Sequence, residues 1–182
     1  MGIGRFRNRE AGWFDALPYA LIAIGAVLRV VPHPWNFAPI GAMALFGGAV
    51  LPRGVGIAVP LAALALSDAV LGFYAGFAWV YGSFVLIGLL GLALRRRRTV
   101  ARIIAASLAS SVLFFLVTNF GEWLGPLYSH HVSGLWASYL AGIPFFRNTV
   151  ASDLIYSLAF FGVYESASRF ARPLVPTAQR TT

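Results

Sequence analysis

Residues 39–51, PIGAMALFGGAVL, form an apolar segment without a single charged or hydroxyl-bearing side chain. The segment has only about thirteen residues, whereas a helix that crosses the hydrocarbon core of a bilayer needs about 20. A re-entrant segment therefore competes with a tilted or thinly flanked span. Its six Gly and Ala residues also make it slim, which lets neighbouring helices approach closely.

The distribution of arginine decides between these two topologies. If every apolar segment crosses, twelve of the fourteen arginines lie on one side, as the positive-inside rule expects. These twelve are Arg5, Arg7, Arg9, Arg53, Arg95 to Arg98, Arg102, Arg169, Arg172 and Arg180. A re-entrant 39–51 segment would instead place the run Arg95 to Arg98 opposite the N-terminus. We therefore expect every segment to cross, with both termini in the cytoplasm.

The chain is predicted to be an all-α membrane protein with six transmembrane helices. Its residues are 59% hydrophobic and only 11% charged, whereas a soluble domain is roughly a quarter charged, so a soluble enzyme is excluded. The predicted spans are Ala16–Val31, Pro39–Leu51, Val55–Phe73, Phe77–Leu94, Val100–Asn119 and Thr149–Phe170. We expect residues 1–172 to form a single transmembrane domain of a multi-pass protein in the bacterial inner membrane. Residues 173–182 are expected to be a flexible cytoplasmic tail.

One long connection, Phe120 to Asn148, separates the fifth and sixth predicted spans and lies on the outer side. Within it, Ser133 to Ile143 are expected to form a short helix at the membrane interface, with Trp136 and Tyr139 as anchors. A loop of this length in a compact protein is usually functional.

Five charged residues fall within or beside the outer halves of the predicted spans: Arg29, Asp68, Glu122, Arg147 and Asp153. A charge within a span costs on the order of 3 kcal/mol at the helix centre, so such side chains are expected to face inward. They could form structural ion pairs, Arg29 with Asp68 and Arg147 with Asp153. They could also form the polar floor of an outward-facing pocket, and both interpretations can hold together.

Aromatic side chains accumulate at the same end, including four of the five Trp residues. An interfacial belt should populate both faces of the membrane, so we expect some of these rings to wall a ligand cavity. The residues predicted to line a pocket or gate are Arg29, Asn36, Asp68, Trp79, Asn119, Glu122, Trp123, Arg147, Asn148 and Asp153.

Other functional classes find little support. The chain has no Cys, and His33 and the adjacent His130 and His131 lack the spacing of a metal site, so no metal or cofactor is expected. No nucleophile turn occurs, so an enzyme is not expected. The formal charge of +8 comes from arginines between apolar segments, which are topology signals rather than a nucleic-acid-binding face. The expected partners are a small-molecule substrate and membrane lipid.

Four groups of residues resemble a widespread family of small bacterial membrane proteins of unknown function. They are residues 29–48 (RVVPHPWNFAPIGAMALFGG), Ser67 and Asp68 with Gly72, residues 118–123 (TNFGEW), and residues 143–148 (IPFFRN) with Asp153. That family is in turn similar to the substrate-binding (S) components of energy-coupling factor (ECF) transporters, in its size, its six helices and its cytoplasmic N-terminus.

The resemblance to S components implies a bundle that binds a vitamin-like metabolite near its outer face and docks on a coupling subunit driven by two ATPases. Ala16 and Ala20 match the alanine pair that docks the coupling subunit in that family, although Pro18 lies between them. No Walker motif occurs in the chain, so ATP hydrolysis would belong to the partners.

These observations lead to one main hypothesis and two alternatives. The main hypothesis is an integral membrane protein that binds a small vitamin-like metabolite at the outer face and transports it inward. The first alternative is a structural subunit of a larger membrane complex, which predicts a core filled by side chains without a cavity. The second is an intramembrane enzyme, which predicts a chemically altered lipid or isoprenoid.

Overall fold

A computed structural model describes residues 12–171 of the chain, all of whose regular elements are α-helices. The six helices are α1 (Gly12–Val30), α2 (Ile40–Val50), α3 (Arg53–Leu71), α4 (Phe77–Leu92), α5 (Val100–Trp123) and α6 (Val132–Ala171). Three of them, α1, α3 and α5, are long and apolar enough to cross a membrane. The predicted tail, residues 173–182, lies outside the described residues, as do the five arginines at positions 5, 7, 9, 172 and 180.

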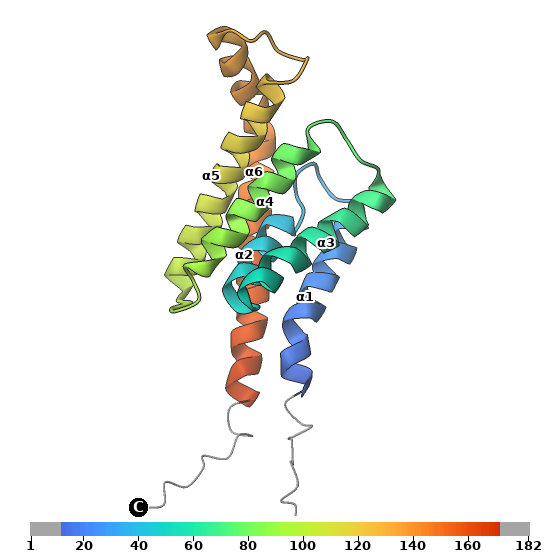
Figure 1. The fold of residues 1–182 in the computed structure, drawn as a ribbon. Coiled ribbons are helices and arrows are strands. Elements are labelled where there is room, and N and C mark those ends of the chain that lie inside the picture. Colours follow the sequence, from blue (N-terminus) through green and yellow to red (C-terminus); the bar gives the residue numbers. More distant parts are fainter. Residues whose placement is uncertain (1–11, 172–182) are drawn as a thin grey trace, which may run out of the picture.

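Successive helices run in opposite directions (Figure 1). The loops 31–39, 72–76 and 124–131 lie toward the upper end of the molecule. The turns 51–52 and 93–99 lie toward the lower end, where α1 begins and α6 ends. The arginines of these elements therefore gather toward the lower end, as the sequence predicts, while Arg29 and Arg147 belong to the upper part.

Helix α2 lies at the centre of the bundle and contacts each of the other five helices. Every residue from Ile40 to Ala49 is buried. The helix has 11 residues, which corresponds to a length of about 16 Å. This is roughly half of the 30 Å thickness of a hydrocarbon core. The bundle is thus built around a helix that fills only part of its height.

Glycines allow α3 and α4 to cross α2 at backbone distance, which confirms the predicted role of the small residues in residues 39–51. A Cβ atom at Gly48 would overlap the backbone carbonyl of Gly88 in α4. A Cβ atom at Gly47 would overlap the carbonyl of Gly56 in α3, and one at Gly91 the carbonyl of Leu45. Larger side chains at these crossings would force the helices apart.

Two arginines of the lower turn cap the C-terminal end of α2. The Arg95 guanidinium donates to the carbonyl oxygens of Gly48 and Leu51, at 3.1 and 2.7 Å. Arg98 donates to the carbonyl oxygen of Ala49 at 3.4 Å, and it also forms an ion pair with Glu165 of α6 at 2.5 Å and lies over the ring of Tyr164. Cations at this position satisfy free carbonyl groups and complement the negative end of the helix dipole.

The connection between α5 and α6 differs from the prediction of a long outer loop at Phe120 to Asn148. In the structure α5 continues to Trp123 and α6 begins at Val132, so the connecting loop comprises residues 124–131. The expected separate interfacial helix, Ser133 to Ile143, is instead the first part of the 40-residue helix α6.

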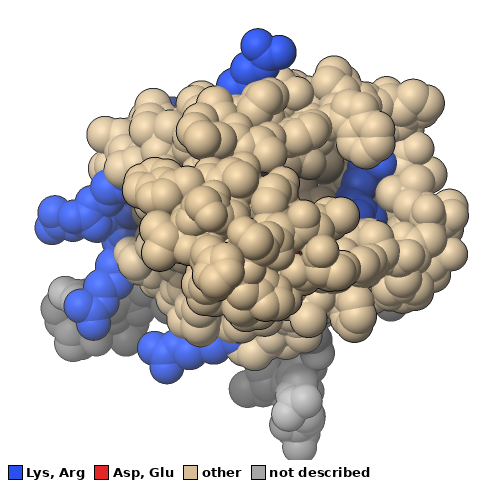
Figure 2. Space-filling model, turned by 90° about the horizontal axis from the view of Figure 1, so that it is seen from above, with Lys and Arg blue, Asp and Glu red and all other residues tan. Residues whose placement is uncertain are grey.

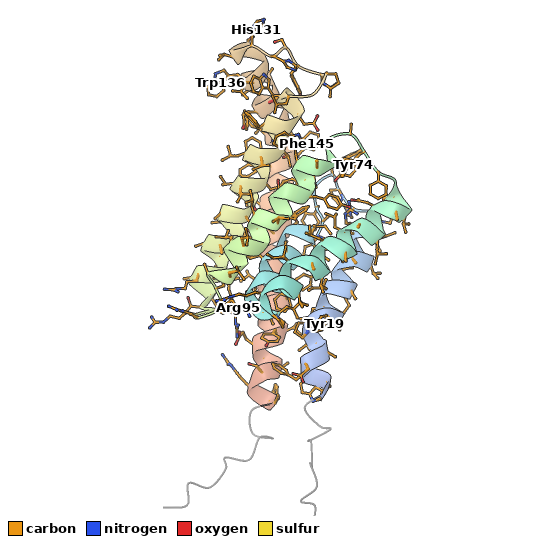
Figure 3. All side chains as sticks on the ribbon, in the orientation of Figure 1. Tyr19, Tyr74, Arg95, His131, Trp136 and Phe145 are labelled. Carbon is orange, nitrogen blue, oxygen red and sulfur yellow. The ribbon has the colours of Figure 1, made fainter. Side chains whose placement is uncertain are left out.

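Pro144 lies inside α6 without ending it. A proline inside a helix removes one helical hydrogen bond and disturbs the preceding turn. Residues on both sides of Pro144 pack on one ring of α5. The ring centroids of Tyr139 and Phe146 lie 5.6 and 4.8 Å from the ring centroid of Phe115. This packing supports the continuity of α6. The paired ends of α5 and α6 extend beyond the other helices at the upper end (Figure 1), where Figure 3 shows His131 and Trp136.

A substitution at the α2–α4 crossing tests this packing. We expect Gly48→Ala to destabilise the protein by about 1–3 kcal/mol or more, because the added methyl group would overlap the Gly88 carbonyl. The matched control is Gly82→Ala on the exposed face of α4, where nothing lies within 4 Å of the added Cβ atom. The control should be neutral or stabilising by up to about 1 kcal/mol. Thermal unfolding in detergent measures both, and equal midpoints for the two variants would contradict the close crossing.

Candidate functional site

A cavity of about 720 Å³ opens beside loop 31–39, above the N-terminal end of α2. It is bounded by the ends or middle turns of all six helices. Seen from the upper end, the molecule is hollowed, and arginine atoms lie within the hollow (Figure 2). Arg29 is the arginine that lines the cavity. The other lining residues are Val30, Val31, Pro32, His33, Trp35, Asn36, Ala38, Ile40, Gly41, Leu64, Leu71, Tyr74, Val80, Phe84, Ile87, Phe114, Thr149, Ser152 and Asp153.

The shortness of α2 explains the position of this cavity. The chain leaves α1 at Val30 and starts α2 only at Ile40, so residues 31–39 take the place of further helical turns. Ile40 and Gly41, the first two residues of α2, line the cavity at its inner end. The space that a longer helix would fill is therefore bounded by a loop and by side chains of the surrounding helices.

Arg29 and Asp68 form a buried ion pair at the edge of the cavity, as the sequence predicts. Arg29 Nη2 donates to Asp68 Oδ1 at 2.5 Å, and the Asp68 side chain is fully buried. Tyr81 donates its hydroxyl to the other carboxylate oxygen, Oδ2, at 2.8 Å. The remaining Arg29 terminal nitrogen donates to Ser67 Oγ. The positive and the negative charge of the pair are thus both compensated by side chains of α1, α3 and α4.

Loop 31–39 is fastened to α6 through its backbone carbonyl groups. Asn148 Nδ2 donates to the carbonyl oxygen of Trp35 at 2.9 Å, and Ser152 Oγ to that of Asn36 at 3.5 Å. Asn36 itself has a φ of +57°, a left-handed conformation that asparagine tolerates better than most residues. Asn148 therefore positions the loop that walls the cavity and does not line the cavity itself.

Asp153 is the second buried acid of the cavity, and its predicted pairing with Arg147 is wrong. Asp153 is 3% exposed, and its Oδ2 atom accepts a hydrogen bond from Ser111 Oγ at 2.7 Å. Arg147 is exposed and forms no ion pair with a described residue. The physical reason is helical phase: six residues along one helix correspond to a rotation of about 240°, so the two side chains point in different directions.

Several other predicted site residues lie at the upper end but outside the cavity lining. Asn119 donates to the Phe115 carbonyl of its own helix, and the Trp123 indole donates to the Ser129 carbonyl of loop 124–131. Trp79 is partly exposed and packs on Phe120, and Glu122 is exposed. These residues and Arg147 therefore do not line the pocket.

The structure also brings polar residues to the site that the sequence did not single out as pocket residues. They are Ser67, Tyr74, Tyr81, Ser111, Thr149 and Ser152. Single hydroxyl groups at unremarkable spacing give no signal of their partners in the sequence. Tyr74 belongs to the loop between α3 and α4 (Figure 3), where burial and then the Asp68 charge raise the pKa of its phenol. Tyr74 therefore remains a neutral hydrogen-bond donor at neutral pH.

Comparison with known proteins assigns the chain to a family. A protein-family profile described as "Family of unknown function (DUF6580)" matches residues 14–175. The chain belongs to the DUF6580 family. The match includes every described helix almost completely, and with it all residues of the cavity. No curated protein and no solved structure gives a significant match to this DUF6580 chain.

Removing one partner of the Arg29–Asp68 pair tests the electrostatics of the site. We expect Arg29→Gln or Asp68→Asn to cost about 3–5 kcal/mol of unfolding free energy, because each leaves an uncompensated buried charge. Tyr81→Phe removes only one hydrogen bond and should cost about 1 kcal/mol. Arg147→Gln, at an exposed position, is the control and should be nearly neutral. Denaturation in mixed micelles measures all four, and wild-type stability of Asp68→Asn would disprove the buried pair.

Proposed function

We propose that this DUF6580 protein is an integral membrane solute-binding protein that takes up a small metabolite from the outer face of the bacterial inner membrane. The observation that carries the proposal is the cavity beside loop 31–39. Its volume of about 720 Å³ falls within the range of small-molecule sites, which span roughly 300–1,000 Å³. Such sites combine mostly apolar walls with a few polar groups that orient the ligand.

The composition of the cavity fits this description. Aromatic rings of Trp35, Tyr74, Phe84 and Phe114 form part of its walls, and Asp153 and Thr149 supply polar groups. A structural subunit would need no such space, and we expect its core to be filled by side chains. An intramembrane enzyme based on a pair of carboxylates is disfavoured, because both Asp68 oxygens are engaged by Arg29 and Tyr81.

The direction of uptake follows from the arginines. The lower turn carries Arg95 to Arg98, and Arg53, Arg102 and Arg169 belong to the same end. Under the positive-inside rule this end faces the cytoplasm, together with both termini. The cavity then opens toward the outer side, where a solute arrives.

A coupling partner of the ECF type remains part of the proposal. Ala16 and Ala20 are both exposed on α1, near the end that we place in the cytoplasm, whereas Pro18 between them is buried. Exposed small residues at this place would let a helix of a coupling subunit approach closely. ATPases bound to that subunit would then supply the energy for transport.

Thermal unfolding of the purified protein with a small-molecule extract of bacterial cells tests the proposal, and native mass spectrometry identifies the bound species. We expect the extract to raise the unfolding midpoint, since a ligand that binds only the folded state stabilises it. Ala38→Trp places a large ring in the cavity and should abolish the shift. Ala109→Trp, on an exposed face of α5, is the matched control and should retain it. An equal shift for both variants, or none for the wild type, would contradict solute binding in this cavity.

A further inference from the structure

The charges around the cavity indicate which class of solute it takes. Among the described residues that line the cavity, Arg29 and His33 are the basic side chains and Asp153 is the acidic one. The Arg29 guanidinium is already engaged by Asp68 and Ser67. The two ring nitrogens of His33 lie 2.9 and 3.0 Å from backbone carbonyl oxygens of Pro34 and Arg29. Neither basic side chain is therefore left free for an anionic solute.

Asp153, in contrast, has one carboxylate oxygen without a partner among the described residues. Its Oδ2 atom accepts from Ser111, whereas Oδ1 lies against Gly41, where an added Cβ atom would overlap it. Gly41 also lines the cavity, so this oxygen lies beside the space available to a solute. Asp153 is only 3% exposed. A carboxylate buried in this way is costly unless it is paired.

Asp153 lies beside the N-terminal end of α2. Gly41 belongs to the first turn of α2, and the cap residue Pro39 supplies no side-chain hydrogen bond to that turn. The N-terminal end of a helix carries a partial positive charge and stabilises a nearby anion. The helix end therefore offsets part of the cost of burying the carboxylate, and a cationic partner would offset the rest.

The aromatic walls complement a cation as well. Trp35, Tyr74, Phe84 and Phe114 line the same cavity as Asp153. The faces of aromatic rings attract ammonium groups, and their area also accommodates an apolar or aromatic body. A solute with a carboxylate or phosphate group would instead meet the charge of Asp153.

We propose that the solute is an organic cation whose ammonium group binds Asp153 and whose apolar or aromatic body contacts the ring-lined walls. This inference rests on the proposed function and narrows it to a substrate class. Asp153 supplies the charge, Ser111 and Gly41 set the position of the carboxylate, and Arg29 is kept from repelling the cation by Asp68.

Three probes of the same size and different charge test the inference: benzylammonium, benzyl alcohol and benzoate. Binding to the purified full-length protein in neutral detergent is measured by thermal shift and calorimetric titration. We expect benzylammonium to bind more tightly than benzyl alcohol, and benzoate to bind most weakly. Asp153→Asn should weaken benzylammonium binding by roughly tenfold or more while benzyl alcohol binding changes little. Asp15→Asn, at an exposed acid at the start of α1, is the control and should change neither.

For each variant, the affinity for benzylammonium is divided by the affinity for benzyl alcohol. Partial unfolding would weaken the binding of both probes, so it leaves this ratio unchanged. Gly41→Ala, which displaces the Asp153 carboxylate without removing an acid, should lower this ratio as well. An equal ratio in the wild type and Asp153→Asn, a preference for benzoate, or no binding of benzylammonium would each overturn the inference. The proposed solute-binding function would survive any of these three results if the cell extract still stabilises the wild type and Ala38→Trp abolishes that stabilisation.

Discussion

The close crossing of backbones around α2 is the constraint on which the rest of the structure depends. Gly47 and Gly48 bring α3 and α4 against a helix of 11 residues, so a segment too short to cross a bilayer straight can still occupy the centre of the bundle. Arg95 satisfies its carbonyl groups at the lower end. At the upper end the helix simply starts late, and the space above it becomes the cavity.

The two buried acids at this cavity have different physical roles. Asp68 is saturated by Arg29 and Tyr81, so it fixes the positions of α1, α3 and α4 relative to one another. Within the described part of the chain, Asp153 accepts one side-chain hydrogen bond, from Ser111, and it lines the cavity beside the first turn of α2. The Arg29–Asp68 pair adds no net charge to the site, whereas the Oδ1 atom of Asp153 has no hydrogen-bond partner among residues 12–171. The proposed uptake of an organic cation follows from this difference.

Much of the fold could be predicted from local sequence, since apolar segments, prolines and arginines mark the helices and their ends. The Arg29–Asp68 pair was also predictable, because both charges fall near the outer ends of their predicted spans, the first and the third. The Arg147–Asp153 pairing failed because segment assignment does not fix the direction of each side chain around a helix. The expected separate helix Ser133 to Ile143 failed as well, since the α5 ring that supports α6 on both sides of Pro144, Phe115, is not local to that segment in the sequence. Partners such as Ser111 and Tyr81 depend on the register between helices, which a single sequence does not contain.

In the proposed orientation the cavity opens to the outer side of the membrane and the arginine-rich end lies inside. The chain has no Cys, so single cysteines can be introduced without removing native ones. Labelling of spheroplasts with a membrane-impermeant thiol reagent then compares Ala38→Cys in the cavity with Arg96→Cys at the exposed lower turn. The account predicts that Ala38→Cys is labelled in intact spheroplasts and that Arg96→Cys is labelled only after permeabilisation. Labelling of Arg96→Cys but not Ala38→Cys in intact spheroplasts would contradict it, and so would an Ala38→Cys variant that stays unlabelled even after permeabilisation.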